Sequence, residues 1–448
     1  MCLADRHNRH GGYQQEPHAE RACSQGVPGR RLEACHLDTP NRARRQIGWA
    51  EAVFLAFFIC LLAACSPENP TELPPASPNT VRIVSSLPRK GPQAAQTEMI
   101  SQAIDLAIKE RQSDLDGLTI EHVALDGGSE ETGEWSTERE RGNALAAAGD
   151  PSVVAYIGPY NSGAAKISLP ITNKAGLFQG SPTTTWPGLT KPGWEEGEPS
   201  IYYPTGERNF VRLMPRDEEE AVAAAKWAAT LELKRAYVLH DGSAYSTGLA
   251  RRFVAAAPAY GIDVKEESGY EPSQAGQVAE EIARSQADLL FYAPSSTSAA
   301  VALAKALEKA GAGVSVIASD TAINDQFAEA VGESASGWRF IQNYAPLPEE
   351  SDKAQAFAGA FRQEYGTPPS LFAANAYDLA NLILDAVKQS RGKDRAAIIR
   401  QVRSARGYAG AGGTITFDEN GDRLDWSMSG YMLAGGKFVV DRLLASAP

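Results

Sequence analysis

Clusters of hydroxyl and acidic side chains follow several short apolar runs, and these clusters carry the binding chemistry that the sequence offers. They are residues 161–163 (NSG), 181–185 (SPTTT), 241–245 (DGSAY), 295–297 (SST) and Asp320. Serine and threonine hydroxyls beside the free backbone N–H groups of a helix start suit an anion such as a carboxylate. An aspartate such as Asp320 can hold an ammonium group through a charge-assisted hydrogen bond. The pattern therefore predicts a site for a small molecule that carries both groups, such as an amino acid.

Each cluster by itself also fits a simpler role. Ser, Thr and Asp are favoured as helix N-caps, where the side chain accepts a hydrogen bond from the first turn. The clusters recur at nearly every strand end, and ligands of open α/β sheets collect at the carboxyl ends of the strands. We therefore expect the clusters to face one cleft.

Catalytic motifs are absent from the sequence, which contains no HExxH, GxSxG or GxxxxGK[ST] pattern. His240, Asp241 and Ser243 resemble part of a hydrolytic triad. Neighbouring positions on a strand point to opposite faces, however, so a strand end followed by a turn is the preferred interpretation. His122 and His240 are the only histidines after residue 65, which is too few for a typical zinc site. We expect no enzyme activity, no metal and no cofactor.

Alternating elements from Thr80 onward must position these clusters. Short apolar runs predict strands, and apolar residues at helical spacing predict helices with one buried face. Strands that alternate with helices imply parallel sheets with helices on both faces. Two such series in a chain of 448 residues predict an α/β protein with two lobes. The expected strands are 81–84, 119–125, 153–157, 236–239, 289–292 and 314–318, and the clearest expected helices are 99–108 and 141–148.

Several strings resemble one known family, in the same order along the chain. Residues 154–163 (VAYIGPYNSG) and 180–185 (GSPTTT) look like the leucine/isoleucine/valine-binding family, the type I periplasmic solute-binding proteins of branched-chain amino acid ABC importers. The likeness runs from about Val81 to Val440. It implies two Rossmann-like lobes joined by a three-segment hinge, with ABC permease subunits as partners. Further similar strings are 175–176, 210–217, 238–241, 244–245, 248–250, 415–422 and 436–438.

The resemblance implies roles for individual residues. Ser162 and Thr185 match positions that bind the ligand carboxylate, and Thr184 matches a position that adds a backbone contact. Tyr245 matches an aromatic residue of the second lobe that closes over the ligand. Asp320 matches the acidic residue that pairs with the ammonium group. The implied ligand is an amino acid or a related small solute.

Two stretches depart from the family's pattern. Where the family often places an aromatic residue, this chain has Ser295 and Ser296, and we include Ser295 among the expected ligand-binding residues. Trp186 follows the threonine cluster, and residues 194–207 (WEEGEPSIYYPTGE) form a longer and more aromatic connector than usual. The side-chain preference of the pocket therefore stays open, and an amide, a urea-like solute or an aromatic acid would also fit.

Closure of two lobes is the mechanism that the resemblance implies. The chain is expected to cross between lobes near 213–216, 342–345 and 408–413. Closure about such a hinge buries the ligand and changes the surface presented to a permease. A carboxylate and an ammonium in a dry cleft must both be paired, because an unpaired buried charge is strongly unfavourable. The expected lobes are 80–213 plus 345–410 and 214–344 plus 411–448.

The N-terminal region predicts export and a lipid anchor. Residues 52–64 (AVFLAFFICLLAA) are apolar, follow three arginines, and lead into Cys65 through Leu-Ala-Ala. That ending resembles the bacterial lipobox, in which the cysteine is lipidated and becomes the new N-terminus. The expected segments are 1–45, a disordered or mis-assigned extension, 46–64, a lipoprotein signal peptide, and 65–79, a Pro-rich tether.

A single-pass anchor over residues 47–65 is the alternative, since this stretch is nearly long enough to span a bilayer. Glu51 and the Pro- and Ser-rich tail after Cys65 argue against it. We expect a bacterial lipoprotein in the periplasm or at the cell surface, in contact with the membrane through its lipid only.

Charge and cysteine content narrow the range of partners. The net charge is −12, and removal of the first 64 residues, with eight arginines and six acids, leaves −14. That charge disfavours nucleic acid and anionic lipid surfaces. All five cysteines lie at or before residue 65, so the folded part offers no thiolate metal site and no cysteine nucleophile.

A second class of function is compatible with the same architecture. Fold does not determine function, and lipoproteins of this kind can act as regulators or sensors through a protein partner. Solute capture is our preferred interpretation, and regulation through a protein partner is the alternative.

Overall fold

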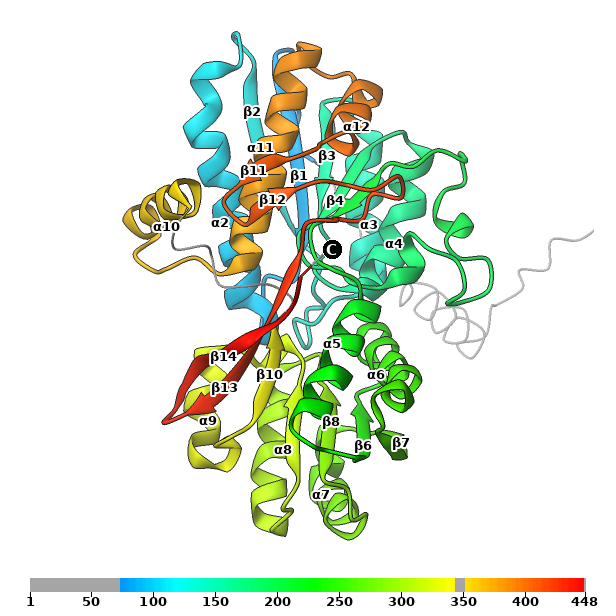
Figure 1. Ribbon diagram of the computed structural model, residues 1–448. Helices are drawn as coiled ribbons and strands as arrows, with labels where there is room; N and C mark the ends of the chain where they lie inside the picture. The colour runs from blue at the N-terminus through cyan, green and yellow to red at the C-terminus, as the bar shows by residue number, and fades with distance from the viewer. Residues whose placement is uncertain (1–72, 343–350, 447–448) are drawn as a thin grey trace, which may run out of the picture. The chain divides into compact units, whose positions relative to one another are not determined.

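The computed structural model describes residues 73–342 and 351–446. These residues fall within one compact unit of the chain, Glu68–Pro448. In the described ranges the strands form a five-stranded, a seven-stranded and a two-stranded sheet (Figure 1). The predicted segments 1–45 and 46–64, Cys65 and the first part of the predicted tether lie outside the described residues.

The five-stranded sheet is parallel throughout and lies at the centre of the first lobe, with strand order β2-β1-β3-β4-β5. Strand β3 (VVAYI) is buried along its whole length, as expected for a central parallel strand covered on both faces. Helices α2 and α11 pack in the core on one face, and α3 packs in the core on the other. The bounds are β1 Thr80–Leu87, α2 Ala94–Arg111, β2 Thr119–Asp126, α3 Thr137–Gly149, β3 Val153–Ile157, α4 Ser162–Lys174, β4 Phe178–Ser181, β5 Phe210–Arg212, α10 Asp352–Tyr365, α11 Leu371–Ser390, α12 Arg395–Arg403, β11 Tyr408–Gly410 and β12 Gly413–Ile415.

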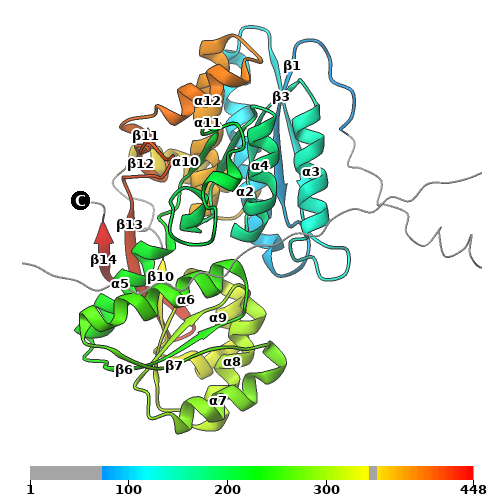
Figure 2. The ribbon, with the colours of Figure 1, turned by 90° about the vertical axis from the view of Figure 1, so that its right-hand side faces the viewer.

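The seven-stranded sheet forms the second lobe, with strand order β14-β13-β10-β9-β8-β6-β7. Five strands are parallel, and the hairpin β13–β14 adds an antiparallel edge. Helices α5 and α6 belong to the core on one face, and α7, α8 and α9 to the core on the other (Figure 2). The bounds are α5 Asp217–Thr230, β6 Arg235–His240, α6 Ala244–Ala256, β7 Asp263–Gly269, α7 Ala275–Arg284, β8 Leu289–Ala293, α8 Thr297–Ala310, β9 Ser315–Ala318, α9 Asp325–Val331, β10 Arg339–Gln342, β13 Ser427–Ala434 and β14 Lys437–Ser446.

The predicted fold class is confirmed: the chain forms two α/β lobes with parallel sheets. Each of the six expected strands is present, with bounds that differ by a few residues at most. Across the described ranges, no helix combines the length and the apolar character needed to cross a bilayer.

The third passage between the lobes lies later in the chain than expected. Ala411 and Phe417 are buried in the core of the first lobe. The buried carboxylate of Asp378 on α11 accepts hydrogen bonds of 2.7 Å from the backbone N–H groups of residues 411 and 412, which fixes the β11–β12 hairpin to this lobe. The expected crossing at 408–413 and the expected boundary at residue 411 are therefore too early. The chain enters the second sheet with β13, at Ser427.

The other two passages are short. The first leads from β5, which ends at Arg212, to α5, which begins at Asp217. The second leaves β10 at Gln342, and residues 343–350 lie outside the described ranges.

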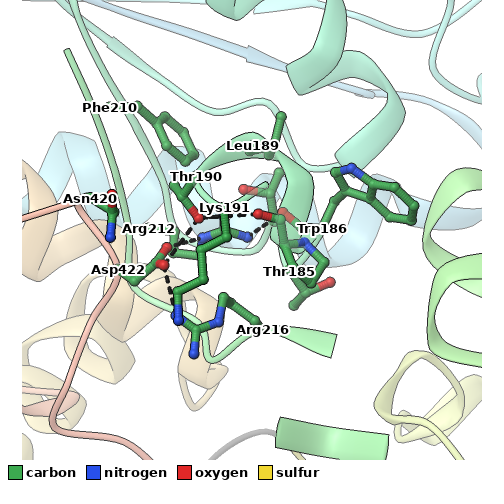
Figure 3. A network of polar contacts seen from close by, with 12 residues as sticks. Thr185, Trp186, Leu189, Thr190, Lys191, Phe210, Arg212, Arg216, Asn420 and Asp422 are labelled. Atoms are coloured by element: carbon green, nitrogen blue, oxygen red, sulfur yellow. Dashed lines mark hydrogen bonds and ion pairs between the residues drawn. The ribbon is translucent and has the colours of Figure 1, made fainter. Parts of the chain in front are cut away.

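A buried network of polar contacts joins the first and third passages (Figure 3). The guanidinium of Arg212 donates to Asp422 Oδ1 at 2.8 Å, to the carbonyl of Trp186 at 2.7 Å and to Thr190 Oγ1 at 2.7 Å. Arg216 donates to Asp422 Oδ2 at 2.8 Å, and Thr190 donates to the same oxygen at 3.0 Å. Arg212 is fully buried and the Asp422 side chain is 3% exposed, so the network operates away from water.

The charge on Asp422 is maintained by its two arginines. Burial by itself would raise the pKa of Asp422, but Arg212 and Arg216 outweigh it and hold that pKa below its usual value. Asp422 is therefore ionised at neutral pH. Its stabilising contribution is present above the pKa of an unfolded aspartate and is lost as the pH falls through the lower, folded pKa.

Replacing Asp422 by Asn should lower the free energy of unfolding by about 3–5 kcal/mol, because the fully buried guanidinium of Arg212 would lose its counter-ion. Urea denaturation at pH 7 measures this change. Glu364→Gln is the matched control, since it breaks the exposed Lys109–Glu364 ion pair and should change stability by less than about 1 kcal/mol. Equal effects of the two substitutions would contradict the role given to Asp422.

Candidate functional site

One cavity of about 400 Å³ is lined by residues of both lobes. Five of the six residues predicted to bind a ligand line it: Ser162, Thr185, Tyr245, Ser295 and Asp320. They come from the start of α4, the loop after β4, the start of α6 and the ends of β8 and β9. The volume suits a small molecule the size of an amino acid.

The first-lobe wall is built around the start of α4. Asn161 precedes the helix, but its side chain makes no capping hydrogen bond, and its Oδ1 atom is buried without a hydrogen-bond partner in the described part of the chain. Ser162 Oγ accepts long contacts of 3.4 Å from the backbone N–H groups of Thr185 and Trp186, which join the helix start to the loop after β4. The capping interpretation therefore fails for this cluster, and the first backbone N–H groups of α4 are available at the cavity.

Thr184 does not take part in the cavity, contrary to the prediction. Its backbone N–H donates to Ser181 Oγ at 3.0 Å, so that donor is already used, and its side chain is buried. Ser181 also accepts from the N–H of Thr183 at 3.2 Å and donates to the carbonyl of Pro159 at 2.9 Å. These bonds turn the loop so that Thr183 and Thr185 line the cavity and Thr184 points elsewhere.

The second-lobe wall is built around Asp320. This residue lies two positions after the end of β9, and the Tyr245 hydroxyl lies 3.5 Å from its Oδ1 atom. Burial raises the pKa of Asp320 to about 7, against the opposing effect of Tyr245 and the local backbone. A cationic group in the cavity would restore the ionised form of this carboxyl.

Capping explains part of the second-lobe clusters. Ser243 and Ser296 accept hydrogen bonds from the first turns of α6 and α8, at 3.1 Å and 3.3 Å. Asp241 accepts from the N–H groups of Ser243 at 3.1 Å and Ser295 at 2.6 Å, so it holds two loops together at the cavity edge. The backbone N–H of Ser295 is therefore occupied, and only the rest of this residue faces the cavity.

The charge of the cavity is one-sided. Glu134, Asp241, Glu271 and Asp320 line it, and none of its described lining residues is Lys, Arg or His. A carboxylate in this cavity would be met by neutral hydroxyl and amide donors. A cation would be met by an aspartate that burial has made a stronger base.

An aromatic wall was missed by the sequence analysis. Trp135, Tyr160 and Phe372 line the cavity, and the rings of Tyr160 and Phe372 meet edge to face at 5.8 Å. Trp135 lies so close to the backbone of Gly163 that a Cβ there would be 2.6 Å from its ring. Phe372 belongs to an amphipathic helix, where its type predicts a core position. Only Tyr160 stood within a string that had been singled out.

No group of three or more His, Cys, Asp or Glu side chains is arranged to hold a metal ion in the ranges that the structure describes.

Residues 80–437 match the family described as periplasmic binding protein. The Leu/Ile/Val-binding protein BraC3 of Rhizobium johnstonii is 26% identical over 357 residues, which cover 79% of this chain and 91% of that protein. Both comparisons extend over nearly all of the two-lobed part of the chain.

Two solved structures show the same fold. LivJ of Streptococcus pneumoniae, a branched-chain amino acid transporter substrate-binding protein in complex with isoleucine, aligns with a TM-score of 0.70 and 22% identity, over 82% of this chain and 99% of LivJ. A solute-binding protein of an ABC transporter from R. palustris, in complex with benzoate, aligns with a TM-score of 0.69 and 19% identity, over 82% and 97% of the two chains. The fold is therefore the two-lobed type I periplasmic-binding-protein fold, and the chain belongs to the periplasmic binding protein family, a family of binding proteins rather than enzymes.

Proposed function

We propose that this protein captures an amino acid between its two lobes and delivers it to an ABC importer. The observation that supports the proposal is the shared cavity, in which Ser162 and Thr185 of one lobe lie with Asp320 of the other. The hydroxyls and the α4 amides would bind the ligand carboxylate. Asp320 would bind the ammonium, with Tyr245 beside it.

The cavity favours a zwitterion over an aromatic acid. Relatives of this fold include structures with isoleucine, with leucine and with benzoate. Benzoate has no cation to pair with Asp320, and none of the described residues that line the cavity is a Lys, Arg or His that could neutralise its negative charge. An unpaired buried carboxylate in the closed cleft would be unfavourable. The aromatic wall of Trp135, Tyr160 and Phe372 would contact an uncharged side chain, such as that of leucine or isoleucine.

Asp320→Ala should weaken amino-acid binding by about thirtyfold or more and leave the fold intact, because loss of one partner of a buried charge pair costs about 2–5 kcal/mol. The shift in melting temperature with a panel of amino acids, amides and benzoate measures binding, since a ligand that prefers the native state stabilises it. Asp263→Asn, at an exposed aspartate of β7, is the control. Wild-type affinity in the Asp320 variant would refute the assignment. A panel without any shift for the wild-type protein would favour the alternative, a regulator that acts through a protein partner.

Amino-acid affinity should depend on pH below about 7. Asp320 has a pKa of about 7 in the free protein, so acid protonates it and removes the partner of the ammonium group. Affinity should then fall roughly tenfold for each unit below pH 7 and be level between pH 7.5 and 8.5. Isothermal titration calorimetry at pH 5.5 to 8.5 measures this dependence. Glu140→Gln is the control, because burial also raises the pKa of Glu140 to about 7 although neither it nor its hydrogen-bond partners line the cavity. A flat profile for the wild-type protein would contradict the role of Asp320.

We also propose that the mature chain is anchored by lipid on Cys65, which lies outside the described residues. The support is the apolar run and the Leu-Ala-Ala-Cys ending found in the sequence. In a bacterial host, the wild-type protein should incorporate labelled palmitate and sediment with membranes, and Cys65→Ser should do neither. Membrane association that persists without label would support the single-pass anchor instead.

A further inference from the structure

The long connector between β4 and β5 forms a compact aromatic cluster on the first lobe. We name residues 186–207 the clasp segment. Trp186 and Tyr202 are buried there against Ala165 and Leu169 of α4. The segment therefore packs against the first lobe through buried side chains, in addition to connecting the two strands.

A buried carboxylate fixes the orientation of Trp186. Glu198 has a fully buried side chain, and it accepts hydrogen bonds from the indole N–H of Trp186 at 3.0 Å and 3.2 Å and from the Tyr202 hydroxyl at 2.5 Å. Lys166 of α4 supplies a positive charge 3.3 Å from Glu198 and lies 4.0 Å from the centre of the Trp186 ring. The close approach requires a glycine at 188, where a Cβ would be 1.8 Å from the carboxylate.

Two tryptophans of the clasp segment meet the second lobe on one helix, α6. Trp186 lies against the backbone at Gly248, where a Cβ would be only 2.4 Å from its ring. The guanidinium of Arg252 lies 3.2 Å above the ring of Trp194. Gly248 and Arg252 are four residues apart and so lie on the same face of the helix. Trp186 and Trp194 contact each other edge to face at 5.3 Å, so they form one surface.

We propose that the clasp segment holds the two lobes together through Trp194 and Arg252 and thereby sets solute affinity from outside the cavity. Trp186, Trp194, Gly248 and Arg252 do not line the cavity, so they cannot act by touching the solute. A contact between lobes that is made when the lobes are arranged to bind solute, and is lost when they separate, raises the population of the binding arrangement, and the apparent affinity rises in proportion.

The size of the effect follows from the type of contact. A cation over an indole ring contributes enough to change a two-state population by roughly three- to thirtyfold, depending on how far water is excluded. Arg252 is half-buried, which places the expected effect within this range. The effect on solute affinity rests on the proposed function. The effect on the separation of the lobes does not.

A cation–ring contact at the end of the clasp segment provides the control. Arg208 lies 4.1 Å above the ring of Tyr203, and both residues belong to the first lobe. Arg208→Ala therefore removes a similar contact of the same region without touching α6. Trp186→Ala is unsuitable as a test, because it removes the indole donor of the buried carboxylate of Glu198 and a large buried side chain of the aromatic cluster, so it would disturb the clasp segment itself.

The test compares Trp194→Ala, Arg252→Ala, the double variant and Arg208→Ala. Calorimetry with L-isoleucine measures affinity, and small-angle X-ray scattering of the solute-free proteins measures the separation of the lobes. Each clasp variant should bind roughly three- to thirtyfold more weakly and have a larger radius of gyration, and the double variant should be no weaker than the weaker single variant. Arg252→Lys should recover part of the affinity, and Arg208→Ala should stay within about twofold of the wild type.

Unchanged scattering and affinity in Arg252→Ala would overturn the proposal, as would additive losses in the double variant. The proposed function can fail separately. If the wild-type protein binds no amino acid, scattering alone decides: a larger radius in Arg252→Ala supports the clasp, and an unchanged radius overturns it.

Discussion

The buried guanidinium of Arg212 is the constraint on which the rest of the structure depends. A fully buried cation must have every donor direction met, and here the partners are Asp422, the carbonyl of Trp186 and Thr190. Those partners come from the last passage between the lobes and from the loop that carries the site. One side chain therefore fixes the end of the first sheet, the hinge and the start of the clasp segment relative to one another.

The proposed binding site follows from this arrangement. Because the carbonyl of Trp186 is held by Arg212, the preceding Thr185 lies beside the start of α4, where Ser162 accepts from both residues. The neutral donors proposed for an anion thus belong to the first lobe. Asp320, which is proposed to bind the cation, belongs to the second lobe, and none of the described residues that line the cavity is Lys, Arg or His. Neither side offers a complete site alone, so solute binding and lobe closure are one event in the proposed function.

The sequence predicted the elements better than the passages between them. Apolar runs identified the strands because buried parallel strands need them. The third crossing was placed too early, at 408–413, because Asp378, which is distant in sequence, binds the backbone of residues 411 and 412 and keeps them in the first lobe. A contact between residues so far apart in the chain leaves no pattern in the local sequence.

The candidate site shows the same difference between features that the local sequence predicts and features that depend on contacts between distant residues. Ser162, Thr185, Tyr245, Ser295 and Asp320 were found because strand ends share an edge, and the cavity brings them together. Thr184 was expected at the site but does not line the cavity, because hydrogen bonds within the turn direct Thr183 and Thr185 toward it instead. Trp135 and Phe372 were missed because a single aromatic residue on a loop or an amphipathic helix is read as packing. The aromatic connector was noticed, but its contact with Arg252 required the structure.

The central claim is that the protein binds both the carboxylate and the ammonium group of the ligand. Analogues that lack one of these two groups test the claim most directly. Calorimetry at pH 8 should compare leucine with isopentylamine, which lacks the carboxylate, and with 4-methylpentanoate, which lacks the ammonium. Both analogues should bind at least about thirtyfold more weakly than leucine, because each leaves one set of buried partners unpaired. If 4-methylpentanoate or isopentylamine binds as tightly as leucine, the claim that the cavity binds both the carboxylate and the ammonium group is wrong.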